Sequence, residues 1–482
     1  MAHRLLAAHA AQNPLPPHAR RSASFDRAHG LGWGSALVFA AIFATLALQR
    51  HAQLLTTGYD LGIFDQGVRA YSEGKLPSSL LKGIDYSLLG DHFSPILATL
   101  APFYAVFGGP QLLLVAQAVL LAVGVVPLTI WAARIVGLRT AIVVALGYGF
   151  AGGLAHAVVF DFHEIAFAVP LLAFSLTALG TRRLLPAALW AAPLVLVKED
   201  LGLTVAGIGA LIAVLAARSD RSGRRLGIAT GLFGVTATVL TSYVVIPLFN
   251  PVGNNNYTGQ VGFGSAVTQL LTLMSNDIKI ATIAVLLLPT AFVALRSPLV
   301  LVVIPTLAWR FLSDNPNYWG SSYHYDAVLV PIVTAAFIDG MLRLRHDAGW
   351  TSFRHRLVLL VSLSATTALL TVSPLAQLLS PALWEASDHV AAARTVLARI
   401  PDGATVAASN SLAAQLTGRA EVSLLGIVPI EMSKPQFIVA DISDRYQFPV
   451  DADGIVEIAA SAQRMGYRVV DVADGFILLA LK

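Results

Sequence analysis

The sequence predicts a polytopic α-helical membrane protein with a small α/β domain at its C-terminal end. Three observations lead to this prediction. The 482 residues are 56% hydrophobic and only 12% charged, whereas soluble domains are about one quarter charged. Apolar runs of roughly 20 residues, each long enough to cross a hydrocarbon core of about 30 Å, recur over most of the chain. From about Pro381 onward the apolar runs shorten and charged residues return.

Eleven segments are apolar enough to be membrane spans, and they must be helices because lipid cannot satisfy backbone polar groups. The predicted spans cover residues 34–50, 111–133, 140–159, 165–181, 184–197, 201–217, 226–248, 278–295, 298–312, 325–342 and 357–379. The apolar segment 93–107 is short and is interrupted by Pro95 and Pro102. These features favour an interfacial or re-entrant helix over a twelfth span.

The distribution of basic residues predicts the orientation in the membrane. With eleven spans, 17 of the 32 Lys and Arg residues fall on one side of the membrane part and seven on the other, and the remaining eight follow the last span. The positive-inside rule therefore predicts a cytoplasmic tail (1–33) and a membrane module (34–380). It also places the first long loop (51–110) and the C-terminal domain (381–482) outside. The Arg-rich start lacks a small-residue cleavage site, so we expect a retained helix rather than a secretory signal.

The C-terminal hundred residues alternate between helical and strand patterns, which indicates an α/β domain. "DHVAAARTVLARI" and "GIVEIAASAQRMG" have helical spacing, and the second ends at Gly466. "ATVAAS", "AEVSLL" and "QFIVADIS" are typical of short strands. "YRVVDVADGFILLAL" predicts a hairpin that turns at Asp474-Gly475.

Composition also restricts the classes of function. The chain has no cysteine, which excludes disulfides and thiolate metal sites. The pI near 9.3 comes from basic residues in short inter-helix loops, where membrane orientation explains them. We therefore expect a lipid bilayer as partner and no nucleic acid.

Acidic residues gather on the predicted outer side of the membrane part, which holds twelve of its sixteen carboxylates. Ionisable groups near membrane depth are costly and indicate function. Polar clusters stand at the span ends in "YDLGIFDQ", "GDHFSP", "FDFHE", "VKED" and "WRFLSDNPNYWGSSYHYD". Their candidate residues are Tyr59, Asp60, Asp65, Asp91, His92, Asp161, His163, Glu164, Lys198, Glu199, Asp200, Arg310, Tyr318, Trp319, His324 and Tyr325. We expect these side chains to converge on one outward-facing cavity.

Each cluster also has a purely structural interpretation. Asp60 can cap the following helix, and Asp65 on that helix can support it or face solvent. Asp91 and His92 can form a local capping pair. The sequence "KED" can be an ion pair at a helix junction, and the Trp and Tyr residues can belong to an aromatic belt.

The motif "DFHE" places Asp161, His163 and Glu164 within four residues, and such side chains can bind a metal. No second cluster of ligands accompanies them in the sequence. We therefore predict no cofactor, and a divalent metal remains an alternative.

The order of these motifs resembles the GT-C superfamily of integral-membrane glycosyltransferases. An acid just after the first span, a long first outer loop and an outer α/β domain carry the resemblance. More narrowly, "YDLGIFDQ", "DHFSP" and "DFHE" resemble a bacterial family of predicted membrane proteins of unknown function. The resemblance implies transfer of a sugar from a polyprenyl-phosphate donor to an envelope glycan, lipid or protein acceptor. The transfer would take place on the outer face of the cytoplasmic membrane, with Asp60 as the general base.

The residue types fit this chemistry. Displacement at an anomeric carbon needs a base to take the proton of the acceptor hydroxyl, and a phosphate leaving group needs nearby positive charge. The outer-side candidates for binding phosphate are Lys198, Arg310, His163 and His324. Asp65, Asp91, Glu199 and Asp200 are the supporting acids. Tyr59, His92, Asp161, Glu164, Tyr318, Trp319 and Tyr325 are the candidates for contacting sugar or acceptor.

Other functions remain open at this point. A transporter or flippase for a lipid-linked sugar would also need a polar cavity, and a non-catalytic envelope-assembly protein would use the outer domain to bind a partner. The Ala- and Arg-rich composition is typical of a GC-rich bacterium, in which arabinofuranose and mannose are candidate donor sugars. The Gly- and Asn-rich stretch 250–264 predicts an outer loop that closes over substrate.

Overall fold

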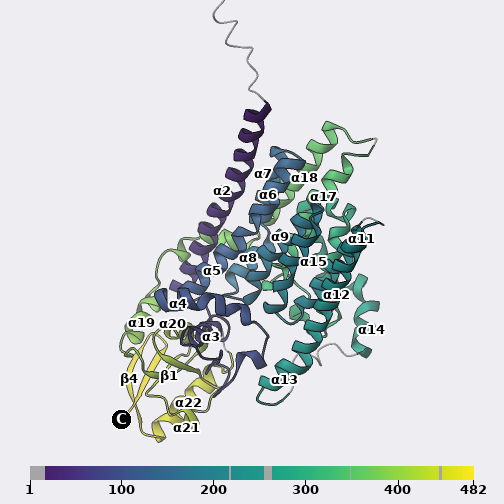
Figure 1. The fold of residues 1–482 in the computed structure, drawn as a ribbon. Helices are drawn as coiled ribbons and strands as arrows, with labels where there is room; N and C mark the ends of the chain where they lie inside the picture. The colour runs from purple at the N-terminus through teal and green to yellow at the C-terminus, as the bar shows by residue number, and fades with distance from the viewer. Residues whose placement is uncertain (1–16, 217–218, 254–262, 348, 445–447) are drawn as a thin grey trace, which may run out of the picture.

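A helical bundle carries a small α/β domain at one of its ends in the computed structural model (Figure 1). The structure describes residues 17–216, 219–253, 263–347, 349–444 and 448–482. The predicted loop 250–264 therefore lies largely outside the described residues. The helices are α2 (Pro17–Ala52), α3 (Ile63–Ser72), α4 (Ala101–Phe107), α5 (Pro110–Val123), α6 (Val125–Ile135), α7 (Leu138–Gly149), α8 (Gly152–Val159), α9 (Ala168–Gly180), α10 (Leu184–Ala191), α11 (Leu201–Leu215), α12 (Arg221–Leu240), α13 (Ile246–Phe249), α14 (Phe263–Leu271), α15 (Asp277–Leu287), α16 (Ile304–Leu312), α17 (Leu329–Leu344), α18 (Ser352–Leu370), α19 (Asp388–Leu397), α20 (Asn410–Leu416), α21 (Ile430–Ser433) and α22 (Ala452–Arg464).

Within the described residues, six helical segments are long and apolar enough to cross a membrane. They are Asp26–Ala52, Pro110–Ile135, Leu138–Val159, Arg221–Phe249, His324–Leu344 and Ser352–Leu370. Five shorter apolar helices accompany them: Pro95–Phe107, Glu164–Gly180, Leu184–Leu196, Leu201–Leu215 and Pro298–Leu312. At a rise of about 1.5 Å per residue, all five are shorter than a straight crossing of a core of about 30 Å needs. Length therefore does not distinguish the segment 93–107 from the predicted spans 165–181, 184–197, 201–217 and 298–312.

Several predicted boundaries differ from the structure. The predicted span 357–379 ends early, because α18 stops at Leu370 and a separate turn begins at Pro374. Helix α2 begins at Pro17, so the second half of the predicted tail 1–33 is helical. The predicted span 278–295 is not one continuous helix. Helix α15 ends at Leu287, a short turn containing Pro289 follows, and Ala291 and Phe292 adopt positive φ. Proline lacks the N–H that continues a helix, which explains the interruption.

The α/β domain confirms the predicted strands and hairpin. Strands β1 (Thr405–Ala408), β2 (Glu421–Leu424), β3 (Phe437–Asp441), β4 (Tyr467–Ala473) and β5 (Phe476–Leu481) form one sheet in the order β2-β1-β3-β5-β4. Strand β1 pairs in parallel with β2 and β3, whereas β5 pairs antiparallel with β3 and β4. Asp474 and Gly475 adopt positive φ at the hairpin turn, as a two-residue turn of this kind requires.

One face of this sheet shares its hydrophobic core with the first loop of the membrane part. Helices α19 and α20 pack on that face. Ile63, Leu81 and Leu88 of the first loop are buried in the same cluster as Leu412 and Leu416 of α20. Helix α22 covers the opposite face. The domain is therefore held to the segment just after α2 by apolar burial, the main favourable term in folding.

Polar contacts fix the register of this junction. Asn410 Oδ1 accepts the backbone N–H of Tyr59 at 2.9 Å, and the Gln66 side chain donates to the Val422 carbonyl at 2.7 Å. Gly58 lies against α20, where an added Cβ would stand 2.5 Å from the Cβ of Ala413. The close approach leaves no room for a side chain at Gly58.

We predict that Gly58→Ala weakens this junction. The added methyl group forces α20 away from the first loop, and overpacking of this kind costs about 1–3 kcal/mol. Thermal unfolding of the purified protein in nanodiscs measures the loss. Gly34→Ala is the matched control, because nothing lies within 4 Å of a Cβ at Gly34. Equal melting temperatures for the two variants would contradict the prediction.

His389 joins α19 to one end of the sheet, where β3 ends beside the β4–β5 turn. Its Nδ1 lies 2.9 Å from Asp474 Oδ2 and its Nε2 lies 3.0 Å from Asp441 Oδ2. Burial opposes the charged form of His389, but hydrogen bonds to these two carboxylates raise its pKa above the ordinary value. The stabilisation is therefore fully present below about pH 6.5 and is lost as the pH rises through the raised pKa.

We predict that His389→Gln lowers the melting temperature more at pH 6 than at pH 9. At pH 6 the wild-type imidazolium is paired with two carboxylates, and its charge is lost as the pH rises through the raised pKa. Differential scanning fluorimetry of both proteins over this range makes the comparison. A deficit that is the same at every pH would show that the contact is not ionic.

Candidate functional site

A cavity of about 400 Å³ lies beside the junction of the bundle and the α/β domain. Its walls come from the five sequence clusters that were predicted to converge. The predicted residues that line it are Tyr59, Asp60, Asp91, His92, His163, Glu164, Lys198, Glu199, Asp200, Tyr318, His324 and Tyr325. Thr238 and Ser242 of the α12–α13 segment complete one wall. The structure thus brings together side chains as far apart in the sequence as Tyr59 and Tyr325.

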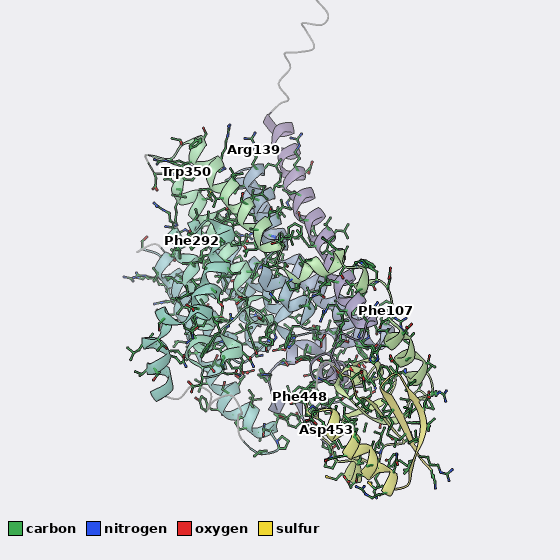
Figure 2. The ribbon with its side chains drawn as sticks, turned by 180° about the vertical axis from the view of Figure 1, so that it is seen from behind. Phe107, Arg139, Phe292, Trp350, Phe448 and Asp453 are labelled. Atoms are coloured by element: carbon green, nitrogen blue, oxygen red, sulfur yellow. The ribbon has the colours of Figure 1, made fainter. Side chains whose placement is uncertain are left out.

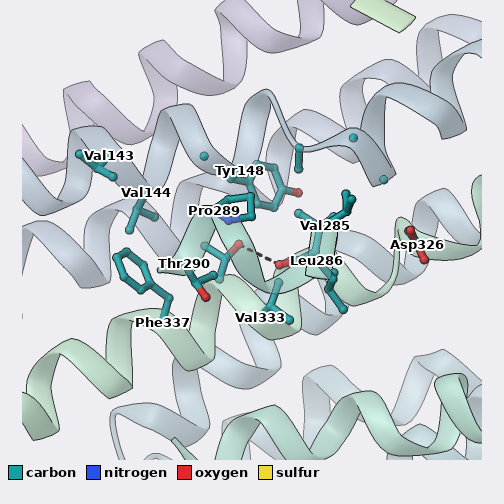
Figure 3. A pocket seen from close by; sticks show the side chains of 16 residues that line it. Val143, Val144, Tyr148, Val285, Leu286, Pro289, Thr290, Asp326, Val333 and Phe337 are labelled. Atoms are coloured by element: carbon teal, nitrogen blue, oxygen red, sulfur yellow. Dashed lines mark hydrogen bonds between the residues drawn. The ribbon is translucent and has the colours of Figure 1, made fainter. Parts of the chain in front are cut away.

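A second, smaller cavity of about 50 Å³ lies inside the bundle among α7, α15 and α17. Figure 3 shows that its labelled side chains are mostly apolar, including Val143, Val144 and Phe337. Asp326 stands at its edge and is already bonded to Arg310 at 2.6 Å. This space therefore holds few groups that could bind or react with a polar ligand, whereas the larger cavity is lined by many.

Asp60 is carried by a single π-helical turn, Gly58–Gly62, that runs directly into α3. Such turns occur frequently at functional sites, and a second one, Thr241–Val245, borders the same cavity. The Asp60 side chain is 31% exposed, and its Oδ1 lies 3.5 Å from His163 Nε2. The carboxylate is therefore accessible from the cavity and has one histidine beside it.

Asp161 fixes the residue that precedes this turn. Its Oδ2 accepts the backbone N–H of Thr57 at 2.7 Å and the Thr57 hydroxyl at 2.8 Å. Burial raises the pKa of Asp161 to about 7, and the neighbouring charge of Asp60 adds to the effect. Gln117 of α5 holds the same loop by accepting the His163 N–H at 2.9 Å. Asp161 does not line the cavity, so its contact is with the loop of Asp60.

Two stacked histidines form part of the wall next to Asp60. The rings of His163 and His324 are 3.8 Å apart and nearly parallel, and Phe160 stacks on His163 at 5.2 Å. Among the described residues, both ring nitrogens of His324 and Nδ1 of His163 are buried without a hydrogen-bond partner. A buried polar atom without a partner is costly, so these nitrogens indicate a place for a polar ligand.

Three pairs of opposite charge line the rest of the cavity. Lys198 Nζ lies 2.9 Å from Glu164 Oε1, and Lys82 Nζ lies 2.9 Å from Asp91 Oδ2. His92 Nδ1 lies 2.7 Å from Glu199 Oε1. The site therefore holds two ammonium groups beside carboxylates, and both lysine side chains are mostly buried.

Burial and ion pairing shift the pKa values of these groups in opposite directions. Burial opposes ionisation of Glu199, but His92 and its hydrogen bond hold the pKa of that carboxyl at about 2. Burial likewise opposes the charge of Lys198, while Glu164, Glu199 and Asp200 raise its pKa well above the ordinary value. Among the residues that the structure describes, Asp200 forms no ion pair as close as these, and burial raises its pKa to about 6. Lys198 is therefore a fixed cation at neutral pH.

Aromatic rings form another wall. Trp309, Tyr318 and Tyr325 pack edge to face, with ring centroids 5.2 Å apart for Trp309–Tyr318 and for Tyr318–Tyr325. Trp319 does not join them. Its indole N–H donates to the Ser313 carbonyl at 2.9 Å, and its ring faces the Lys279 ammonium at 4.3 Å. Trp319 therefore faces away from the cavity, and the predicted contact of Trp319 with a sugar does not fit this structure.

Arg310 also lies outside the cavity. Its side chain is fully buried and donates to Asp326 at 2.6 Å, to the Tyr318 carbonyl at 2.8 Å and to the Gly320 carbonyl at 2.9 Å. All three contacts are within the protein, so the predicted binding of phosphate by Arg310 does not fit this structure. The guanidinium instead holds the loop that positions Tyr318. The predicted cluster contains both Arg310 and Asp326, but their spacing of 16 residues gives no sign that the two side chains pair.

Asp65 is buried behind the wall that carries Asp60. It accepts a hydrogen bond from the Tyr104 hydroxyl at 2.8 Å, and Arg69 lies 3.9 Å away. Burial raises its pKa to about 6. Asp65 therefore connects α3 to α4 and does not reach the cavity.

The residues considered as metal ligands in "DFHE" point to different partners. Asp161 contacts Thr57, His163 faces Asp60 and Glu164 pairs with Lys198. Within the described part of the chain, no group of three His, Asp, Glu or Cys side chains is arranged to hold a metal ion. The sequence spacing of "DFHE" thus does not become a coordination site here.

Sequence reasoning missed several cavity residues, notably Lys82, Phe160 and Trp309. Lys82 could have been found, because it is one of only seven basic residues that the charge pattern places on the acidic side of the membrane. Its ammonium group lies 5.0 Å from the ring centroid of Tyr59. No sequence signal distinguished Phe160 or Trp309 from ordinary membrane aromatics.

Comparison with known proteins now identifies the family. A family model described as "Predicted membrane protein (DUF2079)" matches residues 50–478. The chain belongs to this DUF2079 family. A search of curated proteins found no match. Among solved structures, ArnT from Cupriavidus metallidurans bound to undecaprenyl phosphate is similar to the DUF2079 chain, with a TM-score of 0.56 and 14% identity. The match covers 93% of this chain and 98% of ArnT, and it confirms the predicted GT-C-like membrane fold.

We predict that Glu164→Gln destabilises the DUF2079 protein by about 3–5 kcal/mol, because it leaves the buried Lys198 ammonium without its partner. The double variant Glu164→Gln/Lys198→Met should recover most of the loss, since it removes the unpaired charge. Thermal unfolding in nanodiscs measures both variants. Glu73→Gln is the control, because Glu73 pairs with Lys75 on the surface, where such pairs contribute less than about 1 kcal/mol. A cost at Glu164 no larger than that at Glu73 would contradict the prediction.

Proposed function

We propose that this DUF2079 protein is a glycosyltransferase that moves a sugar from a polyprenyl-phosphate donor to an acceptor hydroxyl at the outer face of the membrane. The single observation that carries the proposal is the cavity in which accessible Asp60 shares a wall with buried cations and aromatic rings. The GT-C-like fold supports it, since ArnT of that fold was solved with undecaprenyl phosphate.

The proposed reaction assigns a role to each group. The Asp60 carboxylate takes the proton of the acceptor hydroxyl, and the acceptor oxygen forms a bond to the anomeric carbon. The bond from that carbon to the phosphate oxygen breaks, and the electron pair leaves with the polyprenyl phosphate. Lys198 and Lys82 stabilise the negative charge on the phosphate. His163 and His324 supply the buried nitrogens that need a polar partner.

The surroundings provide for the remaining parts of the substrates. Tyr318 and Tyr325 present aromatic surface to the sugar, as does Tyr59. The polyprenyl chain would lie along α12, which forms part of the cavity wall and exposes apolar side chains such as Leu232, Phe233 and Val239. Arabinofuranose and mannose are the donor sugars to test first, and the acceptor is an envelope glycan, lipid or protein.

We predict that Asp60→Asn binds donor but loses about 10²–10⁴-fold in turnover, the range expected for loss of a general base. Purified protein in nanodiscs is incubated with a panel of polyprenyl-phosphate sugars and acceptors, with and without EDTA, and products are measured by mass spectrometry. Asp85→Asn is the control. Asp85 is an exposed acid of the same loop that does not line the cavity, and it should retain full activity.

The outcomes separate the candidate functions. Full turnover by well-folded Asp60→Asn would remove Asp60 as the base. Movement of the lipid-linked sugar across vesicle membranes without a new glycosidic product would support a flippase. Absence of donor binding by well-folded wild-type protein would favour a role in envelope assembly.

A further inference from the structure

A second polar cavity, of about 440 Å³, lies at the opposite end of the bundle. Arg139 and Trp350, which line it, are labelled at one end of Figure 2, and Phe448 and Asp453 of the α/β domain lie at the other. The first turns of α7 and α18 form the walls together with the segment that follows α17. This space shares no residue with the Asp60 cavity.

The lining of this second cavity is cationic. Arg139, Arg345, His355 and Arg356 contribute to it, and no carboxylate does. The nearby acids are engaged elsewhere, since Asp339 pairs with Arg343 at 2.7 Å and Asp347 pairs with Arg296 at 2.6 Å. In the part of the chain that the structure describes, neither Arg139 nor Arg356 forms an ion pair. The positive charge at this site is therefore uncompensated by the protein.

The remaining arginine is a fixed part of the wall. Arg345 donates to the Ile135 carbonyl at 2.8 Å and also to the Val136 carbonyl. These are carbonyls at the C-terminal end of α6, which attract cations. Arg345 thereby ties the segment after α17 to α6 and leaves Arg139 and Arg356 as the free guanidinium groups.

Two helices begin at the same cavity. Helix α7 starts at Leu138 and has no side-chain cap at Gly137, whereas α18 starts at Ser352 after the capping residue Thr351. Thr140 Oγ1 lies 3.2 Å from His355 Nε2, so the two first turns are in contact. The N-terminus of a helix carries partial positive charge and free N–H groups. The backbone thus adds to the charge of the arginines.

We infer that this cavity binds a phosphate group. The ligand class is a phosphate ester or free phosphate anion. An arginine guanidinium offers paired donors to phosphate oxygens, and here two unpaired arginines and two helix starts converge on one hollow. Half-buried Trp350 at the rim suits a headgroup at the membrane surface, where indole rings are enriched. Basic pockets between membrane helices bind anionic headgroups in this way.

The inference is independent of the proposed transfer reaction, and its test does not need enzymatic activity. Arg139→Gln/Arg356→Gln is compared with wild type in nanodiscs of phosphatidylcholine. One arm adds phosphatidylglycerol to the bilayer, and the other adds soluble pyrophosphate. Melting temperature and native mass spectrometry report binding. Both arginines are exposed, so the variant should fold normally.

The matched control is Arg221→Gln/Arg225→Gln. It removes two exposed arginines from the first turns of α12, another helix start, but neither lines the cavity. We expect wild type and control to gain stability with added phosphate ligand, and the Arg139/Arg356 variant to bind at least about tenfold more weakly.

The two arms identify the source of the phosphate. A loss confined to the phosphatidylglycerol arm assigns the cavity to a lipid headgroup, and a loss confined to pyrophosphate assigns it to a soluble phosphate compound. Either result supports the site. Equal binding by the Arg139/Arg356 variant and the control in both arms would overturn it.

Discussion

The apolar core shared by the first loop and the α/β domain is the contact on which the rest of the site depends. Ile63, Leu81 and Leu88 come from the membrane part, and they are buried with Leu412 and Leu416 of α20. Gly58 permits α20 to approach the backbone of the π turn. The turn that carries Asp60 is thus held between two parts of the molecule. The α/β domain acts as a structural support for the site, whatever its own binding partners are.

The cavity combines charge that is already compensated with polar atoms that are not. Lys198, Lys82 and His92 each face a carboxylate within 2.9 Å, which offsets the cost of placing ions in a poorly hydrated wall. The nitrogens of His324 lack such partners among the described residues. A site of this kind is stable before substrate binds and still offers unsatisfied groups to a polar ligand. The proposed transfer reaction requires this kind of preorganisation to stabilise a developing charge.

The Asp60 cavity and the cavity at Arg139 and Arg356 differ in the charged groups that line them. The Asp60 cavity contains similar numbers of acids and bases, and most of them are paired. The distant cavity is lined by bases alone and by the starts of two helices. The proposed proton transfer uses the first cavity, and the inferred binding of phosphate uses the second.

Local patterns determined the secondary structure of this protein. Apolar runs marked the helices of the bundle because lipid admits only helices or closed barrels. Short apolar runs rich in β-branched residues marked the strands β1 to β5. The acids at the span ends could be located in the same way, because each motif stands next to an apolar run in the sequence. The predicted span at 278–295 was wrong as a continuous helix, because a single proline and two residues of positive φ outweigh average hydropathy.

Only the tertiary structure decided which of these polar groups meet. Arg310 and Trp319 belong to the same sequence cluster as Tyr318, yet their side chains turn away to Asp326 and Ser313. Lys82 enters the cavity from the part of the first loop between its two motifs, where the sequence shows no polar cluster. Hydropathy indicates whether a segment lies in the membrane. It does not show in which direction a side chain points or with which distant group that side chain pairs. Those choices depend on packing between α20 and the first loop and on ion pairs that span more than a hundred residues, as between His92 and Glu199.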